Sequence, residues 1–363
     1  MHSAVSRRRA ASTAVAAGML AVSGRAARSH TEDVMREDFF VKTTDGYDIA
    51  VRAVAAASDA SRPPVILVHG ARVPGIGSFD LPVPGGSLAA DLARAGHAVH
   101  VMDARGYGRS TRPAAMDAPA EAEAPLARAW AVMRDIDAVV TGVRQRTGTA
   151  AVALLGWATG AMWCGMYAAL NPDRVSHLVY YNGLYGGSAR HSMLGTGTSN
   201  EDPAHPGRFN RRGAGAWRLS AGPDLLRSWD SVIPVEDKAL WRDPRVAEAY
   251  VKEALASDPT AASRTPVSFR APSGAMEDSF YQATGRQLFD AASIAARVLV
   301  VRSARDFWSR PEDVDTLVRH LDRAAAVQSM TIPDATHHVH LDRPERGRDA
   351  FLRAVVSFLA EGY

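Results

Sequence analysis

The sequence predicts an α/β protein: a doubly wound, mostly parallel sheet with a helical lid inserted after its sixth strand. Two strand-like segments joined by Thr44-Asp45-Gly46 begin the pattern after residue 35, which indicates an antiparallel hairpin. Short apolar strand patterns then alternate with helical patterns, as parallel βαβ units require. The alternation breaks once, from about residue 184 to residue 289.

The individual elements follow from the hydrophobic periodicity of the chain. The expected strands are DFFVKT (38–43), YDIAVRAV (47–54), PVILVHG (64–70), HAVHVMDA (97–104), AVALLG (151–156), VSHLVYYN (175–182), ARVLVVRS (296–303) and AVQSMTIP (326–333). The main expected helices lie within 86–96, 125–146, 159–170, 311–324 and 346–359.

The interruption at 184–289 contains many Pro, Gly and Trp residues and no clear strand pattern, so it predicts several short helices joined by loops. A segment of this length is too long for a simple loop. We therefore expect a lid over the strand ends, with an α/β core formed by 35–183 and 290–363.

Residues 1–34 form a separate N-terminal segment. A basic cluster, Arg7-Arg8-Arg9, precedes an Ala-rich apolar stretch and small residues, a pattern that resembles a Sec or twin-arginine export signal. A disordered tail, or a true start at Met35, accounts for the same pattern. The sequence leaves open whether the protein is exported or cytoplasmic, and the high Arg and Ala content indicates a GC-rich, bacterial-like genome.

Composition excludes several functional classes. The 363 residues are 47% hydrophobic and 22% charged with a formal charge of +3, as in a soluble globular protein. No apolar run approaches the roughly 20 residues of a membrane span. The arginines are dispersed among acidic residues, which argues against nucleic-acid binding. The single cysteine, Cys164, excludes an internal disulfide framework and is expected to pack in the core.

Candidate functional residues follow the predicted strands. In a doubly wound sheet, ligands bind beyond the carboxyl ends of the strands. The segments at those ends are LVHGARV (67–73), DARGYGRS (103–110), GWATG (156–160), SARDFW (303–308) and DATHHVH (334–340).

Taken in order, these motifs resemble the α/β-hydrolase superfamily, in particular serine esterases and lactonases with a lid. The resemblance covers nearly all of residues 37–360. Each motif alone is weak, but five in the family order are specific. The resemblance implies a nucleophile elbow at GWATG, with the nucleophile position at Ala158, the acid at Asp306 and the catalytic histidine at His337. It also implies an oxyanion hole formed by the amides of Ala71 and Thr159.

Some of these assignments have alternatives. His338 and His340 lie beside His337, and either could be the base. Some family members carry the acid after the sixth strand, but Asn182 occupies that place and cannot ionise, which favours Asp306. His69, Arg105 and Arg109 are expected to hold loops rather than to bind substrate.

The substrate-binding residues are expected among aromatic side chains near the strand ends and in the lid. Trp157 and Tyr185 are the candidates closest to the site, and Trp217 and Trp229 are the candidates from the lid. Together they indicate a medium-sized apolar or aromatic ester or lactone. For the lid aromatics, packing of the lid onto the core is the alternative role, and it also applies to Trp241, Tyr250, Phe280 and Tyr281.

Ala158 allows three interpretations. We favour an inactive variant of a serine hydrolase, in which alanine replaces the nucleophilic serine, because the rest of the expected catalytic triad is present. A natural ligand-binding homologue is the second. The third is a lyase or cofactor-free enzyme that uses His337 as a base.

We expect a small-molecule ester or lactone partner, no cofactor, no metal, no nucleic acid and no membrane, and a homodimer is compatible with the family.

Overall fold

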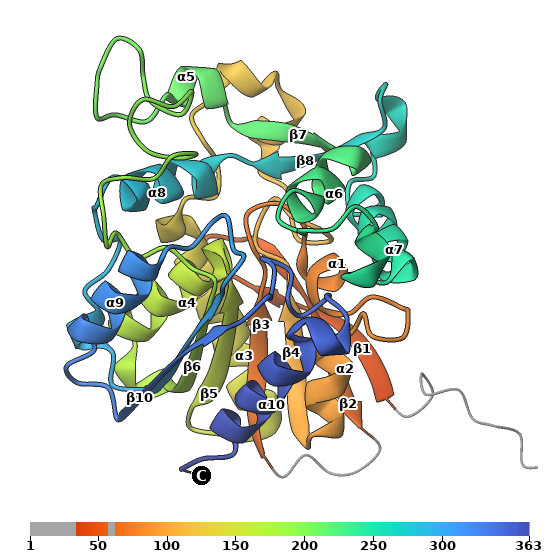
Figure 1. Cartoon of the computed structure of the whole chain (residues 1–363), viewed down its shortest axis with the longest axis vertical. Helices are drawn as coiled ribbons and strands as arrows, with labels where there is room; N and C mark the ends of the chain where they lie inside the picture. The colour runs from red at the N-terminus through yellow and green to blue at the C-terminus, as the bar shows by residue number, and fades with distance from the viewer. Residues whose placement is uncertain (1–33, 57–61, 363) are drawn as a thin grey trace, which may run out of the picture.

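The main sheet has eight strands in the order β1-β2-β4-β3-β5-β6-β9-β10 (Figure 1). This computed structural model describes residues 34–56 and 62–362. The predicted N-terminal segment therefore lies outside the described residues, apart from Val34. The strands are β1 (Val34–Lys42), β2 (Asp48–Ala56), β3 (Arg62–Val68), β4 (His97–Met102), β5 (Val152–Trp157), β6 (Val175–Tyr181), β9 (Arg297–Ser303) and β10 (Ala326–Ile332).

Strand directions agree with the predicted doubly wound sheet. β1 pairs antiparallel with β2, and β2 pairs antiparallel with β4. The pairs β3–β4, β3–β5, β5–β6, β6–β9 and β9–β10 are all parallel. All eight strands predicted from the sequence are confirmed. The inner strands β3, β4, β5, β6 and β9 are short apolar runs that are almost entirely buried, whereas the edge strands β1 and β10 are largely exposed.

Helices cover both faces of the sheet. The core on one face includes residues of α3 (Ala129–Thr147), α4 (Thr159–Leu170) and α9 (Pro311–His320). The core on the other face includes residues of α2 (Leu88–Arg94) and α10 (Arg348–Leu359). Alternate residues of β3 enter the two cores, which explains why this strand is apolar throughout.

The insertion between β6 and β9 lies over the end of the sheet where β3 and β5 finish (Figure 1). It contains α5 (Arg211–Ala214), β7 (Trp217–Ala221), α6 (Gly222–Asp230), α7 (Pro244–Ala256), β8 (Ser268–Pro272) and α8 (Gly274–Ala283). The remaining helix, α1 (Gly75–Phe79), follows β3 in the core. Short 3-10 turns occupy Ala114–Asp117, Ala120–Ala122, Pro172–Arg174, Lys238–Leu240, Ala261–Ser263, Ala291–Ser293 and Pro344–Arg346.

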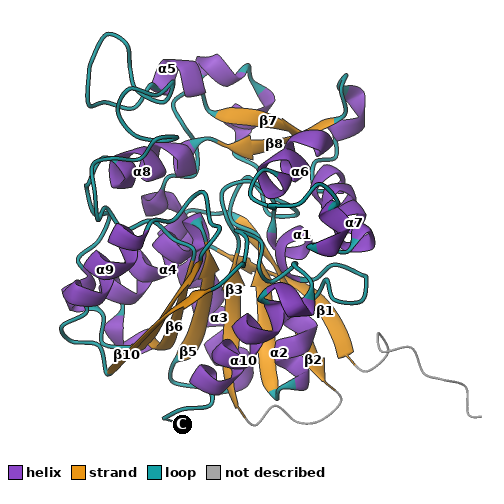
Figure 2. Cartoon of the chain, viewed as in Figure 1, coloured by secondary structure: helices purple, strands orange, loops and turns teal. Residues whose placement is uncertain are grey.

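The expectation of a purely helical lid was incomplete. β7 and β8 form a two-stranded antiparallel ribbon that is separate from the main sheet (Figure 2). Each strand has five residues, and α6 and α7 lie between them in the chain. A strand this short shows little alternation, and its partner is not its neighbour in sequence, so periodicity misses both.

No helix in residues 34–56 and 62–362 has the length and apolar character needed to cross a membrane.

Candidate active site

The turn from β5 into α4 holds Ala158 in an unusual backbone conformation. Its φ is 54° and its ψ is −117°. A non-glycine residue at positive φ carries strain of about 1–3 kcal/mol and persists only where the surroundings impose it. Here the Ala158 N–H donates to the Tyr181 carbonyl over 2.9 Å, and its carbonyl accepts from the Ala161 N–H over 3.1 Å. The strain is therefore fixed by the sheet and the helix on either side.

The glycines of GWATG allow this turn to form. A Cβ on Gly160 would lie 2.1 Å from the Val68 carbonyl oxygen, and a Cβ on Gly156 would lie 2.3 Å from the Gly160 carbonyl oxygen. Both obstacles are backbone atoms, which cannot move aside. The first turn of α4 therefore packs directly against the end of β3, as the elbow interpretation requires.

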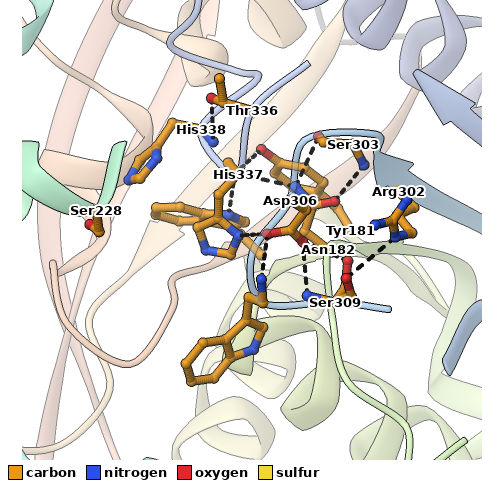
Figure 3. Close-up of polar contacts among 12 residues, drawn as sticks. Tyr181, Asn182, Ser228, Arg302, Ser303, Asp306, Ser309, Thr336, His337 and His338 are labelled. Carbon is orange, nitrogen blue, oxygen red and sulfur yellow. Dashed lines mark hydrogen bonds and ion pairs between the residues drawn. The ribbon is translucent and has the colours of Figure 1, made fainter. Parts of the chain in front are cut away.

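His337 pairs with Asp306 across the ends of two strands (Figure 3). The Nδ1 atom of His337 lies 2.7 Å from Oδ1 of Asp306. Because the carboxylate can only accept, Nδ1 carries the proton and Nε2 is left as the basic nitrogen. Of the three candidate histidines, His337 is the one that contacts Asp306.

The Asp306 carboxylate is held in its ionised form. Burial by itself raises the pKa of this group. The adjacent His337 and hydrogen bonds donated by the Ser309 hydroxyl and the Trp308 amide outweigh burial, so the pKa of Asp306 lies below its usual value. A charged Asp306 stabilises the His337 tautomer and the imidazolium that forms when the ring accepts a proton.

The His337 backbone is fixed by three donors from neighbouring strands. Its carbonyl accepts hydrogen bonds from Trp157 Nε1 at 3.0 Å, Tyr181 Oη at 2.9 Å and Asn182 Nδ2 at 3.2 Å. Asn182 also donates to the Ser303 hydroxyl at the end of β9, on the Asp306 side. Asn182 thus stands at the alternative acid position but joins the two loops that carry His337 and Asp306.

The two neighbouring histidines have other contacts. The His338 ring stacks on Trp229, with ring centroids 4.6 Å apart, and burial lowers its pKa far below the usual value. His340 contacts Tyr181 Oη through Nδ1 and the Ser78 carbonyl through Nε2. Both rings are buried and neutral.

The two residues expected to form the oxyanion hole, Thr159 and Ala71, lie near Ala158 and line the same cavity as Ala158. Thr159 is the first residue of α4, so its amide has no carbonyl four residues earlier within the helix. Ala71 follows the His69-Gly70 turn, and its carbonyl accepts hydrogen bonds from Tyr107 Oη at 2.9 Å and Arg218 Nη2 at 2.6 Å. These contacts fix the turn that carries the Ala71 amide.

Four residues that were expected to be structural make structural contacts. His69 donates through Nδ1 to the Gly70 carbonyl and accepts the Ala104 amide at Nε2. Arg105 pairs with two carboxylates, Asp45 and Asp135, and Arg109 pairs with Asp38. Cys164 is buried in the core, where burial raises the pKa of its thiol.

A cavity of about 130 Å³ lies beside the Ala158 turn and the His337 ring. Its wall contains Ala158, His337 and both expected oxyanion residues. Apolar side chains from the core and the insertion form most of the remainder. The complete lining is Gly70, Ala71, Arg72, Val73, Trp157, Ala158, Thr159, Arg218, Leu225, Ser228, Tyr250, Met276, Phe307, Trp308, His337 and His338.

The structure places only one of the four expected substrate-binding aromatics at this cavity. Trp157 lines it, whereas Tyr185, Trp217 and Trp229 do not. Tyr185 is buried against Phe289. Trp217 donates to the Ala118 carbonyl over 3.2 Å.

Trp229 lies behind His338 and joins the insertion to the core. Its Nε1 atom donates to Oδ1 of Asp342 over 2.8 Å, and its ring stacks on His338. These contacts match the alternative role of packing the lid onto the core, because a buried indole N–H needs an acceptor.

Several cavity residues were not predicted from the sequence. Arg72 directly follows the expected oxyanion residue Ala71, so the HGARV motif could have indicated that Arg72 lies near the site. Arg218 comes from β7, and no sequence signal connects that strand with the core.

The linking role of Asn182 also depends on a contact between distant strands. Phe307 and Trp308 follow Asp306 directly, which is a signal that could have found them.

Within the part of the chain that the structure describes, no group of three or more His, Cys, Asp or Glu side chains is arranged to hold a metal ion.

Comparison with known families agrees with the geometry. A family model described as alpha/beta hydrolase fold matches residues 63–344. The chain belongs to this family. No curated protein sequence matches the chain.

Solved structures share the fold at low sequence identity. E-2-(acetamidomethylene)succinate hydrolase is 18% identical with a TM-score of 0.56, over 90% of this chain and 99% of that chain. The enol-lactonase from Burkholderia xenovorans LB400 is 16% identical with a TM-score of 0.52, over 89% and 100% of the two chains. An esterase from Exiguobacterium antarcticum is 16% identical with a TM-score of 0.53, over 89% and 99%. At these identities the similarity establishes the fold.

Proposed function

We propose that this site is that of a serine-type carboxylic-ester or lactone hydrolase, and that the chain with Ala158 is its inactive form. The observation that carries the proposal is the conformation of Ala158. Its backbone is strained at φ 54°, and its side chain lines the cavity that His337 also lines. A strained residue presented in this way is the usual position of a nucleophile in the family.

With serine at position 158, the arrangement supports the triad reaction. The serine hydroxyl attacks the substrate carbonyl, and Nε2 of His337 accepts its proton. Asp306 stabilises the resulting imidazolium, and the Ala71 and Thr159 amides stabilise the negative oxygen. The leaving alcohol takes the proton from His337. Water activated by the same histidine then releases the acid and restores the serine.

The names of two structural neighbours support an ester or lactone substrate. One neighbour is an enol-lactonase and another is an esterase. The cavity wall around Ala158 also combines apolar side chains with a small number of polar groups, which suits a small carbonyl compound.

The variant Ala158→Ser tests the proposal. We expect this variant to turn over p-nitrophenyl esters or lactones and to be labelled covalently by a fluorophosphonate, and we expect neither result from the Ala158 chain. The gain approaches the order of 10⁶-fold that separates a triad enzyme from its serine-less form. Adding His337→Gln to this variant removes the gain.

Ala158→Gly is the matched control, because glycine adopts the same backbone conformation and adds no nucleophile. A serine variant that neither turns over any ester or lactone nor becomes labelled would contradict the hydrolase proposal. Equal gains in the serine and glycine variants would also contradict it, because the hydroxyl would then have no role.

A second function is favoured by one observation. The His337–Asp306 pair is formed in a chain without a nucleophile, so His337 can act as a general base by itself. A lyase or cofactor-free reaction would use it in this way. Turnover by the Ala158 chain that is lost in His337→Gln would establish this function instead.

A further inference from the structure

Two arginines face the candidate active site from different parts of the chain. Arg72 lies in the turn after β3, and Arg218 lies on β7 of the insertion. Both line the cavity that Ala158 and His337 also line. No aspartate or glutamate is among the residues that form this wall.

Neither arginine is neutralised by a carboxylate. Within residues 34–56 and 62–362, Arg72 and Arg218 form no ion pair, whereas the buried Arg105 pairs with both Asp45 and Asp135. The hydrogen bonds of Arg218 go to two backbone carbonyls, those of Pro272 at 2.7 Å and Ala71 at 2.6 Å. These acceptors orient the guanidinium but leave its positive charge uncompensated.

The charge of Arg72 also acts on Arg218. Burial lowers the pKa of Arg218 to about 10, and the nearby positive charge of Arg72 acts in the same direction. Arg72 also contributes to lowering the pKa of His338, after burial and the neighbouring histidines His337 and His340. The cavity is therefore electropositive, and an anion inside it would stabilise both guanidinium groups.

The position of Arg218 relates this charge to the reacting carbonyl. Arg218 contacts the carbonyl of Ala71, the residue whose amide is the expected oxyanion donor. An arginine has five N–H donors, and two hydrogen bonds of Arg218 to the protein are described, so donors remain for a ligand. A planar guanidinium matches the two oxygens of a carboxylate.

We propose that the cavity selects a substrate that carries a carboxylate close to its ester or lactone carbonyl, and that Arg218 and Arg72 bind this carboxylate. The inference rests on the proposed function, which takes the cavity as the substrate site. It revises the expected substrate from an apolar compound to an anionic one. Trp157, Phe307 and Trp308 provide apolar surface in the same wall.

Calorimetric titration of the Ala158 chain tests this directly, because the chain binds substrate without consuming it. The probes are monomethyl succinate, glutarate and adipate, each compared with its dimethyl ester. At least one monoester binds about tenfold more tightly than its diester. This preference decreases as sodium chloride is added, because salt screens the charges.

Variants assign the preference to the arginines. Arg218→Gln and Arg72→Gln each weaken monoester binding by about tenfold and leave diester binding within about twofold. Arg146→Gln is the control, since it removes one charge from a surface arginine that pairs with Glu37. It leaves both affinities unchanged. Arg72→Gln decides the result if Arg218→Gln does not fold, because Arg72 has no described hydrogen bond to lose.

Three results overturn the inference: equal affinity for monoesters and diesters, a monoester preference that survives both substitutions, or an equal loss of both affinities in both arginine variants. The last result would mean that the arginines only support the Ala71 turn. Failure of the proposed function gives a different result. In that case the Ala158 chain prefers monoesters, but Ala158→Ser hydrolyses none of them. Hydrolysis of neutral esters without any monoester preference contradicts the carboxylate site alone.

Discussion

The catalytic pair in the core and the arginine that the insertion contributes to the cavity differ in how their charges are balanced. On the core side, Asp306 and His337 contact each other, and the loops that carry them are joined by Asn182. On the insertion side, Arg218 contacts only backbone carbonyls and has no carboxylate partner among the described residues. The catalytic pair is formed without a ligand, whereas under the carboxylate proposal the charge of Arg218 is balanced by the bound substrate.

The first prediction tests whether backbone packing on the core side is stricter than packing in the insertion. Gly160→Ala places a Cβ 2.1 Å from the Val68 carbonyl oxygen, a backbone atom. We expect a loss of more than about 4 kcal/mol in the free energy of unfolding, or no folded protein. Gly222→Ala meets only side-chain methyl groups, those of Val251 at 2.7 Å and Leu255 at 3.7 Å. That variant is expected to lose less than about 1.5 kcal/mol.

Urea unfolding followed by circular dichroism measures both variants. Alanine is favoured over glycine within a helix by about 1 kcal/mol, so without the backbone clash Gly160→Ala would be stabilising. A Gly160→Ala protein as stable as the parent would show that the elbow does not depend on this close approach.

The second prediction concerns the contact between the two sides at Asp342. Its carboxylate accepts hydrogen bonds from Thr336 on the histidine loop and from Trp229 on α6. Burial raises the pKa of Asp342 from 3.8 to about 6. Between these pH values the unfolded chain releases the proton and the folded chain keeps it, so stability decreases as pH rises from about 4 to about 6. The expected loss is about 3 kcal/mol.

Asp342→Asn removes this titration. Its unfolding free energy, measured at intervals from pH 4 to pH 7, is expected to lack the decrease that Asp342 causes in the parent. Other carboxylates contribute equally to both proteins, so the difference between the two profiles isolates Asp342. Parallel profiles would show that Asp342 ionises at the same pH in the folded and unfolded chains.

The third prediction has the smallest expected effect and tests whether Trp217 contacts substrate or only packs the insertion. Trp217 was expected to bind substrate, but it lies outside the cavity wall and donates to the Ala118 carbonyl. In the Ala158→Ser background, Trp217→Phe keeps an aromatic ring and is expected to leave kcat/KM within about twofold, with stability lower by about 1 kcal/mol. Steady-state kinetics on the best ester or lactone measures the change. A tenfold loss of kcat/KM would place Trp217 in contact with substrate.

Local sequence patterns predicted the core of this fold because the relevant forces act locally. The inner strands of the main sheet are short apolar runs, and each long helix shows helical periodicity, so burial on both faces of the central sheet is visible in the chain itself. The β7–β8 ribbon was missed because its pairing joins two segments separated by α6 and α7, and neither segment alternates clearly.

The same division applies to the active site. Ala158, Asp306 and His337 follow predicted strands, and their spacing along the chain indicated one site before any geometry was known. Which histidine pairs with Asp306 required the structure, because three histidines lie within four residues. Tyr185 and Trp229 were misplaced as cavity residues, since a buried aromatic in a lid has the same sequence signal whether it faces the cavity or the core.

The sequence by itself predicted the family, the strands of the main sheet along the chain and the motifs at the strand ends, because these depend on local apolar runs and on glycines that only a tight turn requires. The tertiary structure decided the composition of the cavity wall. Arg72 and Arg218 are far apart in the chain and meet only when β7 lies over the end of β3. Neither segment by itself shows that both arginines line one cavity without a carboxylate partner, which is the observation behind the proposed anionic substrate.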